Sequence, residues 1–202
     1  MSLAHRRLQA VPARLTASNV LVSNTGLPEW LRNDISARFD CLGIFRDSPH
    51  GHANHCLINE YLPGQGIMPH EDGAAYHPVV ATVSLSGTLV LDVYEKPSDD
   101  AQDGGREDVQ PRKRWRILQE PRSLLVTTGA AYTDTLHGIA ETEEDVYLNG
   151  ATVANWDLLG QGKQNIVDAE GRNKRTTRIS LTFRDVLKVS SLGSKIFGKP
   201  KG

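Results

Sequence analysis

The sequence predicts a mainly β fold, a β-sandwich or a jelly roll, with one helix near the N-terminus. Three observations lead to this fold class. Several short segments rich in β-branched residues follow one another between turn signals. Only one segment has the apolar spacing of a helix. The chain has 202 residues, which is enough for a hydrophobic core without disulfides or metal ions to hold it together.

The single helix is expected to begin at Pro28. Proline suits the first turn of a helix, because its missing amide hydrogen would have no partner there. Glu29 adds a negative charge at the positive end of the helix dipole. Apolar residues then recur at near-helical spacing, namely Leu31, Ile35, Phe39 and Leu42.

The rest of the chain is interpreted as strands with two inserted loops. Strands are expected at 56–61, 79–85, 88–94, 115–118, 123–127 and 178–184. Ser86-Gly87, between the second and third of these, predicts a tight hairpin turn. The two inserts are polar and cover 96–114 and 140–174. The expected organisation is a basic N-terminal arm at 1–27, one domain at 28–189 and a flexible basic tail at 190–202.

Composition excludes several classes of protein. Apolar residues make up 39% and charged residues 23% of the chain, which argues against a disordered protein and against a membrane protein. The net charge of −1 excludes a globally basic nucleic-acid-binding protein but not a local basic patch. Cys41 and Cys56 are too few for a cysteine-rich zinc site or a disulfide framework, so we expect a reducing compartment.

A metal site is predicted around His70-Glu71-Asp72. Side chains two residues apart on a strand share a face, so an imidazole and a carboxylate can point at one ion. Pro69 favours a sheet edge or a strand end at this point. His137 is the best candidate for a third ligand, and two histidines with one carboxylate form the facial triad of non-haem Fe(II) oxygenases. The alternative is that His70 is a strand-end histidine bonded to a backbone carbonyl.

Two expected strands carry polar faces that are costly in a core without partners. Asn59 and Tyr61 share one face of the first. On the last, Arg178 and Arg184 are six residues apart, so both guanidinium groups point the same way, and Ser180 lies between them. That face can receive a dicarboxylate through paired hydrogen bonds. The alternative is an exposed edge strand with two solvated arginines.

These residues together resemble the AlkB family of Fe(II)/2-oxoglutarate dioxygenases. The resemblance rests on the order and spacing of three motifs: Asn59-x-Tyr61-x-Pro63-Gly64-x5-His70-x-Asp72, then His137-Gly138-Ile139, then Arg178-x-Ser180-Leu181-Thr182-x-Arg184. It covers about residues 53–189, interrupted by the two inserts. The combination of motifs is far more specific than any one of them.

The resemblance implies a double-stranded β-helix, or jelly roll, with iron between its two sheets. It assigns His70, Asp72 and His137 as the iron ligands. Arg178 would hold the distal carboxylate of 2-oxoglutarate, Arg184 would lie near the metal, and Asn59 and Tyr61 would contact this co-substrate. The family reaction consumes Fe(II)-activated O2 and 2-oxoglutarate, releases succinate and carbon dioxide, and hydroxylates a substrate carbon, often an N-methyl group.

The resemblance also implies a substrate class, a modified base in single-stranded DNA or RNA. Residues 1–27 would then form a nucleotide-binding lid, with Arg6, Arg7 and Tyr76 as substrate-contacting candidates. Ala74 stands where DNA-repair members often carry an acid, which favours a neutral or non-base substrate. A protein hydroxylase or demethylase with the same site, and a poorly active nucleic-acid-binding module, are the alternatives. We expect a monomer in cytoplasm and nucleus, with no membrane partner.

Overall fold

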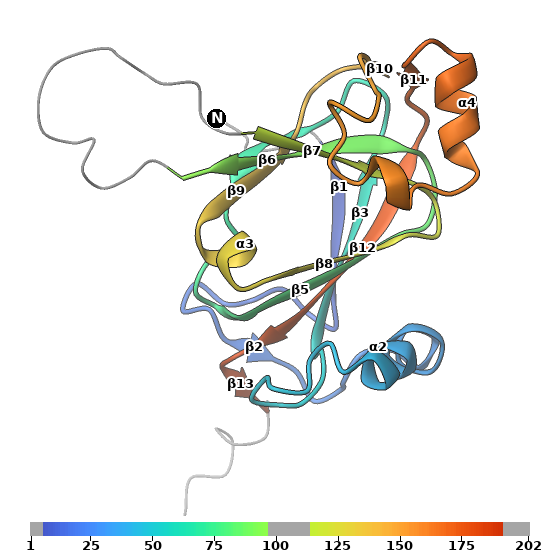
Figure 1. The fold of residues 1–202 in the computed structure, drawn as a ribbon. Helices are drawn as coiled ribbons and strands as arrows, with labels where there is room; N and C mark the ends of the chain where they lie inside the picture. Colours follow the sequence, from blue (N-terminus) through green and yellow to red (C-terminus); the bar gives the residue numbers. More distant parts are fainter. Residues whose placement is uncertain (1–5, 97–113, 192–202) are drawn as a thin grey trace, which may run out of the picture.

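The structure is a computed structural model that describes residues 6–96 and 114–191. Two antiparallel sheets face each other, which confirms the predicted mainly β jelly roll (Figure 1). The five-stranded sheet contains, in spatial order, β1 (Arg7–Val11), β3 (His55–Tyr61), β12 (Arg178–Val186), β5 (Tyr76–Ser84) and β8 (Leu124–Thr128). The four-stranded sheet contains β4 (Ile67–His70), β9 (Thr135–Ile139), β6 (Leu89–Glu95) and β7 (Arg114–Gln119).

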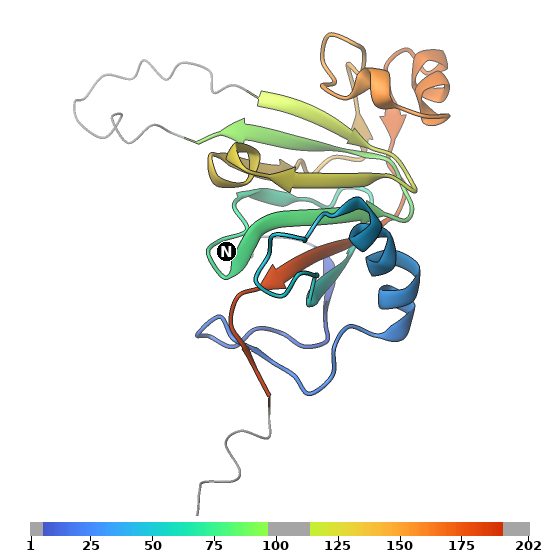
Figure 2. The same ribbon diagram turned by 60° about the horizontal axis from the view of Figure 1, so that its bottom comes forward.

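The predicted helix is present and covers the outer face of the five-stranded sheet (Figure 2). It consists of α1 (Glu29–Leu31), a π-helical turn (Arg32–Ser36) and α2 (Ala37–Leu42). Phe39 packs edge-to-face on Phe183 of β12, with ring centroids 5.0 Å apart. Leu42 ends α2 and is 66% exposed, so its predicted place on the apolar face is wrong, whereas Phe39 is buried as predicted.

The predicted hairpin at Ser86-Gly87 is wrong, although both strands exist. β5 pairs with β12 and β8, whereas β6 pairs with β9 and β7, so the turn carries the chain from one sheet to the other. Gly87 has φ +58°, and a Cβ atom there would lie 2.7 Å from the carbonyl oxygen of Thr177. Glycine is therefore required at this turn by a close approach of two backbone segments as well as by its left-handed conformation.

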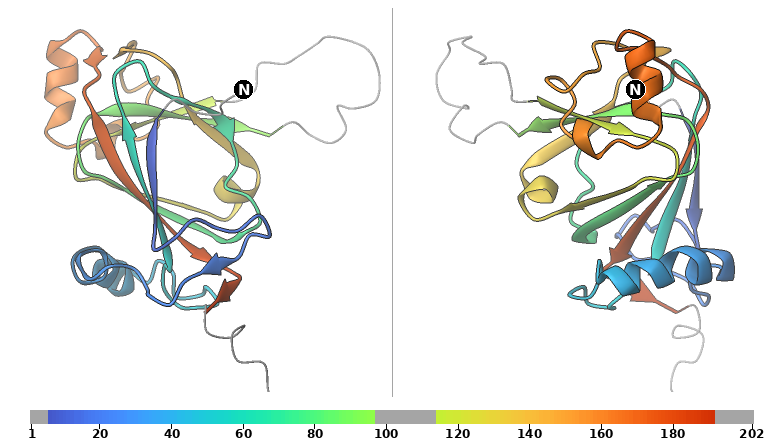
Figure 3. Two further views of the ribbon diagram at one scale, coloured as in Figure 1. Left: turned by 180° about the vertical axis from the view of Figure 1, so that it is seen from behind. Right: turned by 45° about the vertical axis from the view of Figure 1, so that its right-hand side comes forward.

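The second insert, 140–174, is a packed structure and differs from the expected loop. It contains β10 (Glu144–Asp145), a 3-10 turn (Trp156–Leu158), α4 (Gly162–Asp168) and β11 (Asn173–Lys174). Its side chains Leu148, Val153 and Ile166 pack against Val90 and Leu118, on the outer face of the four-stranded sheet. Figure 3 shows this insert in orange, on the opposite side of the molecule from the blue helical segment.

The insert also covers the free edge of β7. The Asn155 side chain accepts a hydrogen bond from the Leu118 amide and donates one to its carbonyl, each at 2.9 Å. At the base of the insert, Arg175 and Asp145 form a buried ion pair, and Arg175 also donates to the carbonyl of Ala140. An edge strand covered in this way cannot pair with another chain.

The N-terminal segment enters the fold as a strand. β1 pairs antiparallel with β3, so part of the expected basic arm is the edge of the five-stranded sheet. A small parallel pair joins β2 (Leu21–Val22) to β13 (Val189–Ser190). Most of the first insert, 97–113, and most of the predicted tail, 192–202, lie outside the described residues. Within the part of the chain that the structure describes, no helix has the length and apolar character needed to cross a membrane.

Candidate functional site

Two histidines and one aspartate meet at the edge of the four-stranded sheet. The register of β4 and β9 pairs His70 with His137, and their ring centroids are 4.5 Å apart. Asp72 follows two residues after the end of β4, in a turn that includes Gly73 with φ +83°. One ligand atom from each of the three residues lies within 4.8 Å of the others. Asp72 joins the group through this turn and not through strand alternation.

The two histidines are placed to offer ring nitrogens to a metal ion. His70 donates from Nδ1 to the Met68 carbonyl at 2.9 Å, which leaves Nε2 as the ligand atom. The backbone bond of the alternative interpretation is thus present and is compatible with metal binding. Burial lowers the pKa of His137 to about 4, so its imidazole is neutral at neutral pH. Two imidazoles and a carboxylate, without a thiolate, fit Fe(II) in its facial triad.

The two arginines of β12 are buried inside the fold. β12 is the central strand of its sheet, and Arg178 and Arg184 are only 2% and 6% exposed, so the edge-strand alternative is wrong. Arg184 donates a short hydrogen bond to the carboxylate of Asp72. The predicted alternation is confirmed, because Leu181 and Phe183 are buried on the opposite face among the apolar residues beneath the helix.

Arg178 is a buried cation held by neutral groups. It donates to the hydroxyls of Ser180 and Ser84 at 2.8 and 3.0 Å, and to the Gln119 side-chain oxygen at 2.6 Å. In the described ranges, no carboxylate accepts a hydrogen bond from Arg178, and its Nε has no partner. Burial lowers the pKa of Arg178 to about 10, so it stays charged at neutral pH. This arrangement suits a ligand carboxylate, which would supply the missing negative charge.

Sequence reasoning missed Gln119 and Ser84. Both are buried and polar, and both hold the Arg178 guanidinium from strands distant in sequence. Gln119 follows Trp115 and Ile117 at intervals of two, so all three share the inner face of β7. A polar residue at an inward position of an apolar strand was the available signal, because such a group is costly without a partner.

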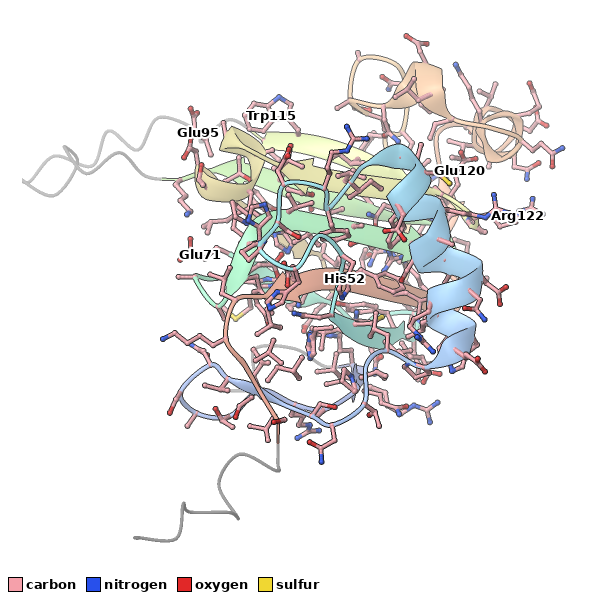
Figure 4. All side chains as sticks on the ribbon, turned by 90° about the horizontal axis from the view of Figure 1, so that it is seen from below. His52, Glu71, Glu95, Trp115, Glu120 and Arg122 are labelled. Atoms are coloured by element: carbon pink, nitrogen blue, oxygen red, sulfur yellow. The ribbon has the colours of Figure 1, made fainter. Side chains whose placement is uncertain are left out.

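A cavity of about 570 Å³ between the two sheets joins these groups. Strand register places Trp115, Val93, His137 and His70 in one row across the four-stranded sheet, and all four line the cavity. Figure 4 shows Glu95 and Trp115 at one end of the molecule and Glu120 at the other. Trp115 and Gln119 lie near opposite ends of β7, and Gln119 accepts from Arg178, so Arg178 lies toward the end of this strand away from Trp115.

Arg6 and Arg7 point to opposite faces of the sheet. Arg6 lines the cavity, where its Nε donates to the Asn59 Oδ1 at 2.9 Å and its guanidinium lies 5.6 Å from the Tyr61 ring centroid. Arg7 lies on the outer face and forms an ion pair with Glu60 at 2.8 Å. Of these two arginines, only Arg6 lines the cavity, so they cannot share one role there.

Tyr76 supports Arg184 and is not among the cavity-lining residues. Its ring centroid lies 4.8 Å from the Arg184 guanidinium carbon, and the ring also stacks on the buried His55, with ring centroids 6.3 Å apart. His55, Tyr76 and Arg184 are thus in contact in that order, and Arg184 donates a hydrogen bond to Asp72. The predicted contact of Tyr76 with a substrate therefore has no support from its position.

Comparisons with known proteins give consistent matches. Residues 5–184 match the 2OG-Fe(II) oxygenase superfamily. A Danio rerio protein named "Probable RNA/DNA demethylase ALKBH6" is 35% identical over 187 residues, which are 93% of this chain and 74% of that protein. The Xenopus tropicalis protein "tRNA (carboxymethyluridine(34)-5-O)-methyltransferase alkbh8" is 32% identical over 147 residues, which are 71% of this chain and 19% of that protein.

Two solved structures are also similar to this chain. The structure of OsALKBH1 covers 79% of this chain and 66% of its own, with 18% identity and a TM-score of 0.45. A Pseudomonas putida prolyl-4-hydroxylase covers 91% of this chain and 74% of its own, with 14% identity and a TM-score of 0.41.

Proposed function

The chain belongs to the 2OG-Fe(II) oxygenase superfamily, and from this premise we propose that it oxidatively dealkylates a modified base in DNA or RNA. Members of this superfamily use Fe(II), 2-oxoglutarate and O2, and this enzyme is a dioxygenase. When bound, the iron supplies the oxidising chemistry in which one oxygen atom of O2 enters a substrate C–H bond and the other enters succinate, with release of carbon dioxide.

The proposed roles of the residues follow from their positions around the cavity. His70, Asp72 and His137 would hold the iron, and Arg178 would hold the distal carboxylate of 2-oxoglutarate. Arg184 would orient Asp72. One observation carries this assignment: two histidines and an aspartate line the same cavity as the buried Arg178, which donates to no carboxylate among the described residues.

Asn59 and Tyr61 complete the proposed co-substrate site from β3. Both are buried and line the cavity, and in the β3–β12 register Asn59 is paired with Ser180 and Tyr61 with Arg178. Burial raises the pKa of Tyr61, so its hydroxyl keeps its proton and can donate a hydrogen bond to a carboxylate. The pairing supports a shared role in binding 2-oxoglutarate.

A nucleobase substrate is supported by the cavity wall beside the metal ligands. Val93 and Trp115 continue the row of His137 across the sheet, so an apolar and aromatic surface lies next to the reacting position. Aromatic side chains stack on unpaired bases of any sequence. The Danio rerio relative is named as a probable RNA/DNA demethylase, which agrees with this substrate class. The base must leave a duplex to enter, which favours a single strand.

Formaldehyde release tests the proposal. With Fe(II) and 2-oxoglutarate, we expect single-stranded oligonucleotides that carry N-methylated adenine or cytosine to yield formaldehyde and succinate in equal amounts, because the hydroxymethyl group leaves the nitrogen. The same oligonucleotide without the methyl group is the control. Formaldehyde from methylated peptides, with none from methylated oligonucleotides of either sugar, would contradict the nucleobase substrate and favour a protein demethylase.

Arg6 and Arg7 should differ in their effect on the same reaction. Arg6→Ala should raise the KM for the oligonucleotide several-fold, because Arg6, unlike Arg7, lines the cavity. Its loss should also reduce the slope of log affinity against log salt by about 0.7, the value for one phosphate contact on a single strand. Arg7→Ala, on the outer face, is the matched control. Equal effects of the two variants would contradict a contact specific to Arg6.

A further inference from the structure

The turn that carries Asp72 is joined to the short helix α3 (Ala130–Thr133) on both sides of the aspartate. On one side, the Tyr132 hydroxyl donates to the Gly73 carbonyl at 2.9 Å. On the other, the Lys96 ammonium pairs with the Glu71 carboxylate and donates to the Thr133 carbonyl at 2.5 Å. Residues 71 and 73 are therefore both tied to one segment, and Asp72 lies between them.

The helix α3 is itself a fixed support. It begins after Gly129 and leads directly into β9, the strand that carries His137. The Thr135 hydroxyl donates to the Ala131 carbonyl at 2.6 Å, and the Lys96 amide donates to the Asp134 carbonyl at 3.0 Å. The segment that holds the Asp72 turn is thus continuous with the strand of a second proposed ligand.

The turn needs such support because it lies between two strands and belongs to neither. β4 ends at His70 and β5 begins at Tyr76, and Gly73 between them has a left-handed backbone and no side chain to pack. The bond from Arg184 fixes the carboxylate of Asp72 but not the backbone that carries it. Without the two tethers, the backbone of residue 72 would be free to move relative to the histidines.

We propose that Tyr132 and Lys96 are positioning residues that set the place of Asp72 relative to His70 and His137 before a metal ion binds. This inference rests on the proposed iron site. Neither residue is among those that line the cavity, so each acts through the turn and not by touching substrate or co-substrate. Groups that orient metal ligands typically change metal affinity by about 10- to 100-fold when they are removed.

The ionisation of Tyr132 agrees with this role. Burial, and next the negative charge of Asp72, raise the pKa of Tyr132 to about 12. The hydroxyl therefore keeps its proton throughout the neutral range and can donate to the Gly73 carbonyl, which can only accept.

Titration of metal-free protein with Mn(II), followed by electron paramagnetic resonance, tests the inference without turnover. Tyr132→Phe removes one hydroxyl and should weaken Mn(II) binding about 10-fold, with the melting temperature of the metal-free protein unchanged. Tyr147→Phe is the matched control, because Tyr147 is 78% exposed on the second insert. Lys96→Met should weaken binding in the same direction, and Lys96→Arg should restore part of it.

The outcomes separate this inference from the proposed function. If the wild type fails to bind Mn(II), or if His70→Ala binds it equally well, the proposed iron site is wrong. If the wild type binds and Tyr132→Phe and Lys96→Met bind equally well, only the positioning role is overturned. The melting temperature of metal-free Tyr132→Phe could also fall far enough to account for the weaker Mn(II) binding. Tyr132 would then stabilise the fold as a whole, and the positioning role would again be overturned. If Tyr132→Phe does not fold, the Mn(II) affinity of Lys96→Met decides whether the positioning role holds.

Discussion

Single replacement of His70, Asp72 or His137 by alanine should abolish 2-oxoglutarate turnover. Fe(II) in a facial triad depends on three protein ligands, and the structure offers these three, with ligand atoms within 4.8 Å of one another. Loss of a direct ligand should weaken metal binding more than the roughly 10- to 100-fold caused by loss of an outer partner. Succinate formation and Mn(II) titration measure the two effects.

His52→Ala is the matched control for these variants. His52 is an exposed histidine outside the cavity, so its loss should change neither turnover nor Mn(II) affinity (Figure 4). The melting temperature of each metal-free variant shows whether the fold is intact. Full turnover by a folded His137→Ala variant would show that the third ligand is a different residue.

Replacement of Arg178 by lysine should raise the 2-oxoglutarate concentration required for half-maximal turnover. Arg178 is buried, and its planar guanidinium bonds to Ser180, Ser84 and Gln119, while its Nε has no partner among the described residues. An ammonium group cannot reproduce the planar fork that binds a carboxylate through two hydrogen bonds. Loss of a buried charge-assisted pair costs about 2 to 5 kcal/mol, and we expect the lower end, about 30-fold in KM, because lysine keeps the charge.

Arg172→Ala is the matched control for Arg178→Lys. Arg172 lies in the second insert and pairs with Glu144 at the surface, so its removal should leave the KM for 2-oxoglutarate unchanged. Arg175 is unsuitable as a control, because its buried pair with Asp145 joins the two ends of the second insert. Equal effects of Arg178→Lys and Arg172→Ala would mean that a diffuse positive field, and not a specific site, attracts the co-substrate.

The sequence by itself determined which faces of the strands are polar. The alternation from Arg178 to Arg184 predicted two guanidinium groups on one face and an apolar opposite face, and the structure confirms both, because side-chain direction along a strand depends only on local backbone geometry. The helix after Pro28 and the six strands were predictable for the same reason, since each is a local pattern.

Only the tertiary structure decided which elements meet. The turn at Ser86-Gly87 has the local chemistry of a hairpin, yet both flanking strands find other partners, because pairing is chosen by burial over the whole chain. The pairing of His70 with His137 depends on the register of β4 and β9, which are distant in sequence.

Groups that hold the site from outside its motifs were likewise decided by the fold. Gln119, which accepts from Arg178, and Tyr132, which donates to the turn that carries Asp72, both lie outside the motifs found in the sequence. These contacts join residues that are far apart in the sequence. Closing the long loops between them costs conformational entropy, so the contacts form only together with many others in the folded chain. The sequence therefore identified the residues that can bind a metal ion and a carboxylate, and only the folded chain determined which other residues hold them in place.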